Sequence, residues 1–256
     1  MSDIAITRLI FAYVFVWMLY LFMRNRKIQQ DKLLLLASFR MTIQLVLAGY
    51  VLGIILQVDN PIITISTIFL MEIFAILNIK KIAQQKLSLP ILKSVTLSLT
   101  TGTLLVLFFF LLVVVNPPSL FDPRYWIPLA GMIIGNAMTG ISIGLKTLLD
   151  NVESKKDQIQ TSLHLGAEPK DAIGDILNKS FEAAILPTLN SMLGMGIIFL
   201  PGMMSGQIIA GSSPITAIRY QIGIMLGITG SVSLSIFIFS STVWRSFFNE
   251  KKQFIS

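Results

Sequence analysis

Cysteine is absent from the sequence of 256 residues, and histidine occurs once, as His164. The lack of cysteine excludes disulfides, thiolate metal sites and cysteine nucleophiles, and a single histidine excludes a metal site built from several histidines. No Walker-type phosphate-binding loop occurs, so energy from ATP would have to come from another chain. The sequence also shows no motif typical of a Ser-His-Asp catalytic triad. The sequence therefore predicts a protein that is not an enzyme and binds no cofactor itself.

Charged residues are scarce as well, at 13% of the chain, whereas apolar residues make up 54%. An ordinary soluble domain carries about 25% charged residues. The apolar residues form unbroken runs rather than periodic stripes, which makes lipid the expected solvent for most of the chain. The net charge of +7 does not indicate a nucleic-acid partner, because the lysines and arginines lie in short clusters between the apolar runs.

Seven apolar runs are long enough to cross a bilayer as helices, which takes about 20 residues each. Helices are expected because an unpaired backbone finds no hydrogen-bond partner in lipid. The sequence thus predicts an all-α, polytopic bundle in the cell membrane, with residues 1–256 forming a single transmembrane domain. The seven windows are 4–23, 33–56, 61–79, 91–115, 126–149, 183–200 and 220–243.

Lysine and arginine gather after each odd-numbered window, and the even-numbered gaps contain few of them. By the positive-inside rule, this bias places the N-terminus outside and the C-terminus in the cytoplasm. Prolines at positions 117, 118 and 123 predict a short, stiff outer loop between the fourth and fifth windows. The basic residues are Arg24, Arg26, Lys27, Lys32 and Arg40; Lys80, Lys81, Lys86 and Lys93; Lys155, Lys156 and Lys170; and Arg245, Lys251 and Lys252.

The longest polar stretch, residues 150–182, is expected in the cytoplasm. Its apolar residues are spaced among charges, which predicts an amphipathic helix, a break at Gly166–Pro169 and a second helix that starts near Pro169. One interpretation is a solvated connector. The other is a docking surface, because such a turn presents a short helix end to a groove on a partner. The candidate docking residues are Leu163, Leu165, Gly166, Ala167, Pro169 and Ala172.

Several polar side chains fall inside the apolar windows, where they are costly unless they face a partner or water. Glu72 lies near the middle of the third window, and its carboxylate fits either a salt bridge to an arginine such as Arg40 or Arg219, or a place on a transport path. The amides of the other candidates also suit hydrogen bonds between helices. The candidate path residues are Glu72, Gln44, Asn136, Asn190, Met203 and Met204.

The segment Leu200–Gly206 contains two helix breakers in a stretch that is still apolar. Irregular backbone at membrane depth is tolerated only against protein or water, so this segment predicts a broken or re-entrant element beside a path, with an ordinary outer loop as the alternative. Met203 and Met204 offer thioethers, which suit soft ions better than iron and more often fill gaps in a core. Small residues that predict close helix packing are Gly131, Gly135, Gly140, Gly194 and Gly196.

Four long and unusual blocks of the sequence resemble FetB-type permeases of ABC transporters, a family related to the plant aluminium-sensitivity membrane proteins. The blocks are Arg40–Leu52, Ile127–Met138, Leu163–Ile173 and Leu200–Ile222, and the similarity covers nearly the whole chain. The resemblance implies a membrane subunit that exports a metal ion, with iron favoured, and that assembles as two permeases with two cytoplasmic ATP-binding subunits. It assigns no metal ligands.

The turn Leu165–Pro169 also resembles the ATPase-docking loop of ABC importers. This chain departs from that pattern, because Gln160, Thr161 and Ser162 stand where Glu-Ala-Ala precedes the glycine in importers. The resemblance therefore implies the docking role and not the importer geometry. Two other functions fit the residues: a secondary carrier driven by protons through Glu72, and a membrane scaffold that transports nothing.

Overall fold

The computed structural model describes residues 6–58, 60–82, 87–117, 119 and 121–255. The described residues form helices and no strand. Six of these helices are long and apolar enough to cross a membrane, which confirms the prediction of a polytopic helical bundle. Residues 4 and 5 of the first window, Lys86 of the second basic cluster and Pro118 of the outer loop lie outside the described residues. The chain divides into two compact units, residues 1–59 and 60–256.

The first unit is a helical hairpin of α1 (Ile6–Asn25) and α2 (Asp31–Val58), joined by a turn in which Lys27 has a φ of 54°. A hydrogen bond between the hydroxyls of Tyr13 and Thr42 links the two helices. Both helices expose large apolar side chains along most of their length. A helix that is apolar all round is typical of a membrane-embedded segment.

The second unit contains the remaining helices, and its core is lined by apolar residues from all of the long ones. Proline begins three of these long helices, where its missing N–H removes no hydrogen bond. The elements are α3 (Pro61–Ile82), α4 (Leu89–Phe109), the π-helical turn η1 (Phe110–Val115), α5 (Pro123–Ser154), α6 (Lys156–His164), α7 (Pro169–Ala172), α8 (Gly174–Gly194), α9 (Gly202–Ile209), α10 (Pro214–Val243) and the 3-10 turn η2 (Trp244–Phe247).

Contacts between the helices of this unit define their directions. Gly140 and Gly144 of α5 face Val232 and Ile236 of α10 in the same order, so α5 and α10 run parallel. On α8, Gly140 approaches Ala184, and Gly144 approaches both Ala184 and the earlier Ser180, so α8 runs antiparallel to both. By the same argument α3 is parallel to α5, and α4 is antiparallel to α10. Neighbours in the chain therefore alternate in direction, as successive membrane passes do.

Glycines bring the backbones of these helices together at several crossings. A Cβ atom added to Gly102 of α4 would lie 2.8 Å from the Cα of Ser235 in α10. In α5, Gly140 and Gly144 have similarly close neighbours in α8 and α10, and Gly131 lies next to Met71 of α3. Close packing is therefore confirmed for Gly131 and Gly140. Gly135 differs, because no atom lies within 4 Å of a Cβ added there.

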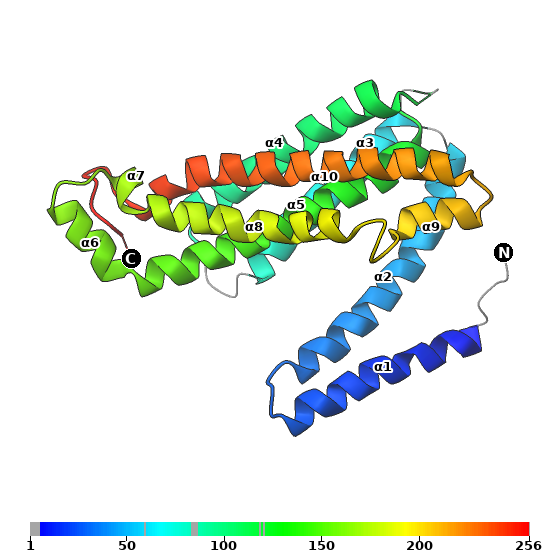
Figure 1. Ribbon diagram of the computed structural model, residues 1–256, viewed down its shortest axis with the longest axis horizontal. Coiled ribbons are helices and arrows are strands. Elements are labelled where there is room, and N and C mark those ends of the chain that lie inside the picture. The colour runs from blue at the N-terminus through cyan, green and yellow to red at the C-terminus, as the bar shows by residue number, and fades with distance from the viewer. Residues whose placement is uncertain (1–5, 59, 83–86, 118, 120, 256) are drawn as a thin grey trace. The chain divides into compact units, whose positions relative to one another are not determined.

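The sixth window, 183–200, does not form one helix. Instead α8 begins earlier, at Gly174, and ends at Gly194, and α9 starts at Gly202 (Figure 1, yellow to orange). The break covers residues 195–201, so the predicted irregular segment Leu200–Gly206 was placed too late. Its cause is Gly196, whose φ of 85° ends the helix, together with Pro201, which starts the next one. Since α8 and α9 both pack on α10, the two helices together run beside α10 despite the break between them.

Candidate functional site

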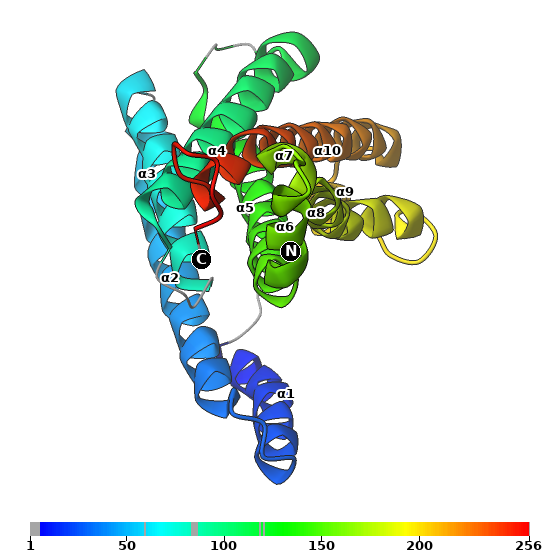
Figure 2. The same cartoon turned by 90° about the vertical axis from the view of Figure 1, so that its left-hand side faces the viewer.

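The α6–α7 turn lies at the end of the second unit where α5 and α8 meet (Figure 2, end facing the viewer). Ile159 of α6 and Ile173 after α7 are fully buried and fix the turn to the bundle. Gly166 has a φ of 92°, a conformation that favours glycine, and Pro169 is the first residue of α7. These features confirm the predicted helix, break and second helix. The second helix is short, however, because α7 has four residues before a new helix begins at Gly174.

The two leucines of the turn occupy different environments. Leu163 is half-buried and packs against the core, whereas Leu165 is 84% exposed. Ala167 and Ala172 are half-buried, and Pro169 is buried. Thus buried residues hold the turn in place, and Leu165 is the large apolar side chain that it offers to the surroundings.

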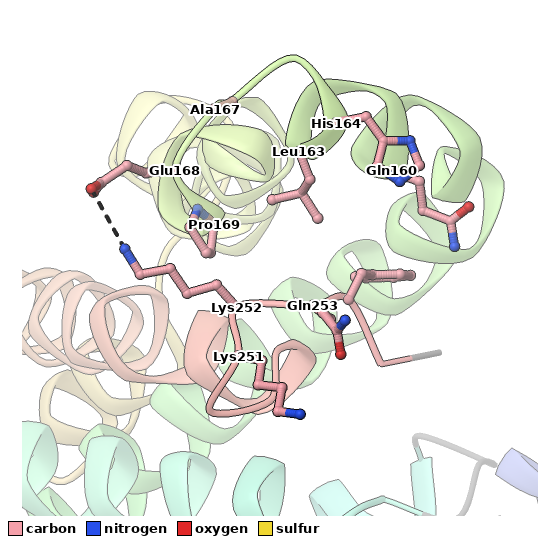
Figure 3. Close-up of a pocket in the computed structure, with 10 residues that line it drawn as sticks. Gln160, Leu163, His164, Ala167, Glu168, Pro169, Lys251, Lys252 and Gln253 are labelled. Atoms are coloured by element: carbon pink, nitrogen blue, oxygen red, sulfur yellow. Dashed lines mark ion pairs between the residues drawn. The ribbon is translucent and has the colours of Figure 1, made fainter.

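A short hairpin near the C-terminus packs beside this turn. Phe248 and Phe254 pair in a β-bridge, and their rings meet edge to face at 5.9 Å. Lys252 forms a salt bridge of 3.8 Å with Glu168, and both side chains are largely exposed. Between the hairpin and the turn lies a pocket of about 680 Å³, shown in Figure 3. Its walls are Gln160, Leu163, His164, Ala167, Glu168 and Pro169 on one side and Lys251, Lys252, Gln253 and Phe254 on the other.

The sequence reasoning missed this hairpin, because it treated Lys251 and Lys252 only as markers of orientation. The signal that was available is the pair of phenylalanine groups, Phe247 with Phe248 and then Phe254, on either side of these lysines. Aromatic residues that flank a charged stretch outside the membrane indicate a packed element rather than a loose tail.

Glu72 of α3 is 2% exposed and faces α4. The hydroxyl of Thr103 donates a hydrogen bond to Oε1 of Glu72, whereas Oε2 is buried without a partner among the described residues. Arg219 is exposed and makes no salt bridge in the described part of the chain. Arg40 belongs to the other unit. Thr103 was not predicted, although residues 100–103, Thr-Thr-Gly-Thr, stand out as polar within the fourth window.

The other predicted path residues are spread over several helices. Gln44 is exposed on α2, in the first unit. Asn136 is exposed on α5 and donates a hydrogen bond of 2.8 Å to the carbonyl of Met132 in its own helix. Asn190 is exposed on α8. No hydrogen bond between described residues joins any two of the predicted path residues.

Met203 and Met204 lie on α9, at the end of the second unit away from the α6–α7 turn. Met204 is buried, and Met203 lines a pocket of about 220 Å³. This pocket is walled by α9 together with the first two turns of α5 and α10: Arg124, Tyr125, Pro128, Leu129, Met203, Gln207 and Tyr220. Both methionines therefore face protein, and the two tyrosines were not among the predicted residues.

No three histidine, aspartate or glutamate side chains gather closely enough to hold a metal ion in the described ranges. The polar side chains that remain as candidates lie singly, on different helices. They are the carboxyl of Glu72 in the interior and the amide of Asn136 on an exposed position of α5.

Long apolar helices, alternating directions and a polar turn at one end define a multi-pass α-helical membrane protein. The chain belongs to the family described as Uncharacterised protein family (UPF0014), whose model matches residues 6–248. It is 35% identical over 244 residues to the Probable iron export permease protein FetB of Escherichia coli, covering 95% of this chain and 92% of that protein.

Two further relatives extend the comparison. The UPF0014 membrane protein YjkA of Bacillus subtilis is 33% identical over 248 residues, with 94% of each chain covered. Protein ALUMINUM SENSITIVE 3 of Arabidopsis thaliana is 36% identical over 157 residues, which is 61% of this chain and 56% of that protein. No solved structure matches the chain. These relatives confirm the resemblance to FetB-type permeases and to the plant aluminium-sensitivity proteins.

Proposed function

We propose that this chain is the permease subunit of an ABC transporter that exports a metal ion across the cell membrane. A separate ATP-binding subunit binds ATP and docks on the α6–α7 turn. The observation that carries the proposal is the contrast within that turn, in which buried Ile159, Pro169 and Ile173 hold an exposed Leu165 in place. A partner can transmit force only through a rigid element, and one apolar side chain at the centre of an interface often supplies much of its binding energy.

The name of one relative supports the choice of cargo. The E. coli relative is named a probable iron export permease, so we propose iron or another metal ion as cargo for this chain. An ABC transporter requires two ATP-binding subunits for hydrolysis, and two copies of this permease would match them. Each permease lacks a phosphate-binding loop of its own, which is consistent with ATP on the partner.

The docking role is tested by substituting Leu165→Asp and co-purifying the permease with a co-expressed ABC ATP-binding subunit. Loss of a central apolar contact costs about 2 kcal/mol or more, which weakens binding about thirtyfold. The matched control is Leu89→Asp, because Leu89 is 73% exposed at the start of α4, which contacts η2 near the same end of the unit.

We expect Leu165→Asp to release the ATP-binding subunit while the permease keeps its gel-filtration profile. Leu89→Asp should leave the complex intact. If Leu165→Asp binds normally and Leu89→Asp does not, the docking site lies instead in the loop Lys80–Lys93, part of which is outside the described residues.

The orientation of the chain in the membrane decides whether the α6–α7 turn can reach a cytoplasmic ATP-binding subunit. Ser154 and Ser119 are exposed near opposite ends of α5, and the native chain has no cysteine to interfere with labelling. A cysteine at position 119 should react with an impermeant thiol reagent in intact cells, and one at position 154 should react only after permeabilisation. Labelling of position 154 in intact cells contradicts both the orientation and the docking role.

A second function, a carrier driven by protons, is favoured by one observation, the buried carboxyl of Glu72 with its unpartnered Oε2. The two functions differ in their energy source. Inverted membrane vesicles that contain the permease and the ATP-binding subunit should accumulate radiolabelled Fe²⁺ when ATP is added, and a protonophore should not stop them. Uptake without ATP that the protonophore abolishes would favour the carrier.

A further inference from the structure

One side of α5 exposes polar side chains near its start, its middle and its end. Arg124, Pro128, Asn136, Thr139, Lys146 and Asp150 are exposed, and Gly135 lies among them with no neighbouring atom within 4 Å of an added Cβ. At 3.6 residues per turn these positions fall on one face of the helix. We call this set the open face of α5.

The middle of this face lies at membrane depth. Asn136 follows Pro123 by thirteen positions, which is about 20 Å along the axis, and α5 as a whole is about 48 Å long. A hydrocarbon core about 30 Å thick therefore includes Asn136 and Thr139. Thr139 bonds to the carbonyl of Gly135 at 3.0 Å, but Oδ1 of Asn136 accepts no hydrogen bond from the described part of the chain.

The exposed positions of α3 and α10 are different. On α3 they include Ile73, Phe74 and Leu77, and on α10 they include Leu226 and Phe237. Those apolar faces suit lipid. Amide and hydroxyl groups in the middle of a span are costly in lipid and normally face protein.

The charges at the inner end of the open face indicate what covers it. Lys146 and Asp150 are one turn apart, and neither forms a salt bridge with a described residue. If two copies pack about a twofold axis along the membrane normal, their α5 helices run parallel, and Lys146 of one copy lies about one turn from the level of Asp150 of the other, a separation that the long lysine side chain can span. The same symmetry places Asn136 opposite its counterpart, and Gly135 permits close approach.

We propose that a second copy of this chain packs against the open face of α5, with Asn136 and Thr139 at the contact. This inference rests on the proposed function only in its use of two permeases. It identifies which helix joins the two copies, and it can be tested without ATP, cargo or the ATP-binding subunit.

Disulfide cross-linking gives a direct test, because the native chain contains no cysteine. Asn136→Cys and Thr139→Cys are oxidised in membranes with copper phenanthroline and analysed on non-reducing gels. A disulfide requires the two Cα atoms to lie within about 7 Å. The matched controls are Ile73→Cys and Phe237→Cys, at exposed apolar positions of α3 and α10.

We expect a shift to twice the chain's mass for the variants at positions 136 and 139, and none for the controls. Monomer alone at 136 and 139 overturns the proposal, as does equal cross-linking at a control position. Either result would leave the open face of α5 to another occupant, such as the α1–α2 hairpin of the same chain.

A charge exchange provides a second readout. Lys146→Asp and Asp150→Lys should each reduce the cross-link at position 136 several-fold, and the double variant should restore it. Reduction by the single variants without restoration by the double variant would contradict the pairing of Lys146 with Asp150.

Discussion

The two sides of α5 differ in whether other helices of the same chain pack against them. On the packed side, Gly140 and Gly144 touch α8 and α10 so closely that an added Cβ would lie within 3 Å of a neighbouring side chain. On the open side, no atom lies within 4 Å of a Cβ added to Gly135, and Asn136 and Thr139 are exposed. The same kinds of small and polar residues therefore serve two purposes. One side makes the core of this chain, and the other side is available to something else.

Among the substitutions that compare the two sides, Gly144→Leu is expected to lower the stability of the chain most. Its Cβ would lie 2.7 Å from Ile236 Cδ1 and 3.3 Å from the carbonyl of Ser180, so the extra atoms force two helices apart. Overpacking of this kind costs about 3 kcal/mol or more when the backbone must move. Thermal unfolding of the purified protein in detergent measures the loss.

The matched variant is Gly135→Leu, nine positions earlier on the same helix. Because the space beside Gly135 is open and leucine favours helices, we expect a midpoint of unfolding at least equal to that of the native chain. A similar loss of stability in both variants would mean that the open side is packed by the chain itself.

A smaller effect is expected at Glu72, the one buried residue with a charged side chain in the described chain. Replacing it with glutamine keeps the hydrogen bond from Thr103 and removes the ionisable group, so the fold should be preserved. If the carboxyl serves transport, ATP-driven uptake of Fe²⁺ should fall about tenfold, which corresponds to about 1.4 kcal/mol. Unchanged uptake would assign Glu72 to structure.

Thr103→Val is the control for this substitution, because it removes the hydrogen bond and nearly conserves the volume. A structural role for the pair predicts that this variant lowers the unfolding midpoint and that Glu72→Gln does not. A lower midpoint for Glu72→Gln alone would show that the charge itself stabilises the bundle.

The smallest effect is expected from Ser180→Ala, on the packed side. The hydroxyl of Ser180 donates a hydrogen bond of 2.7 Å to the carbonyl of Gly144, and a typical bond of this kind contributes about 1 kcal/mol. Thr139→Ala, on the open side, removes a bond to its own helix and should leave thermal unfolding of the single chain unchanged. Equal effects would remove the distinction between the two sides.

Local chemistry made part of this structure predictable. The turn at Gly166 and Pro169 follows from the backbone preferences of two residues, and the windows follow from runs of apolar residues. These features depend on neighbours in sequence, which the chain itself displays. The docking residues were identified in the same way, although their role stays a prediction.

Other features depend on contacts between distant segments. Thr103 meets Glu72 across 31 positions, and nothing in either segment specifies the other. The hairpin around Lys252 packs on Glu168 across an even longer separation. The break at residues 195–201 was misplaced because the positive φ of Gly196 is not visible in an apolar run that also suits close packing.

The π-helical turn η1 gives α4 a property that a uniform helix lacks. Phe110 begins this turn, and its ring lies against Gly223 and Gly227 of α10. A π-helical turn holds one more residue than an α-helical turn. If it changed to α-helix, the residues that follow Val115 would rotate by about 100° relative to α4. The π-helical turn therefore sets the direction in which the chain leaves α4 at Asn116.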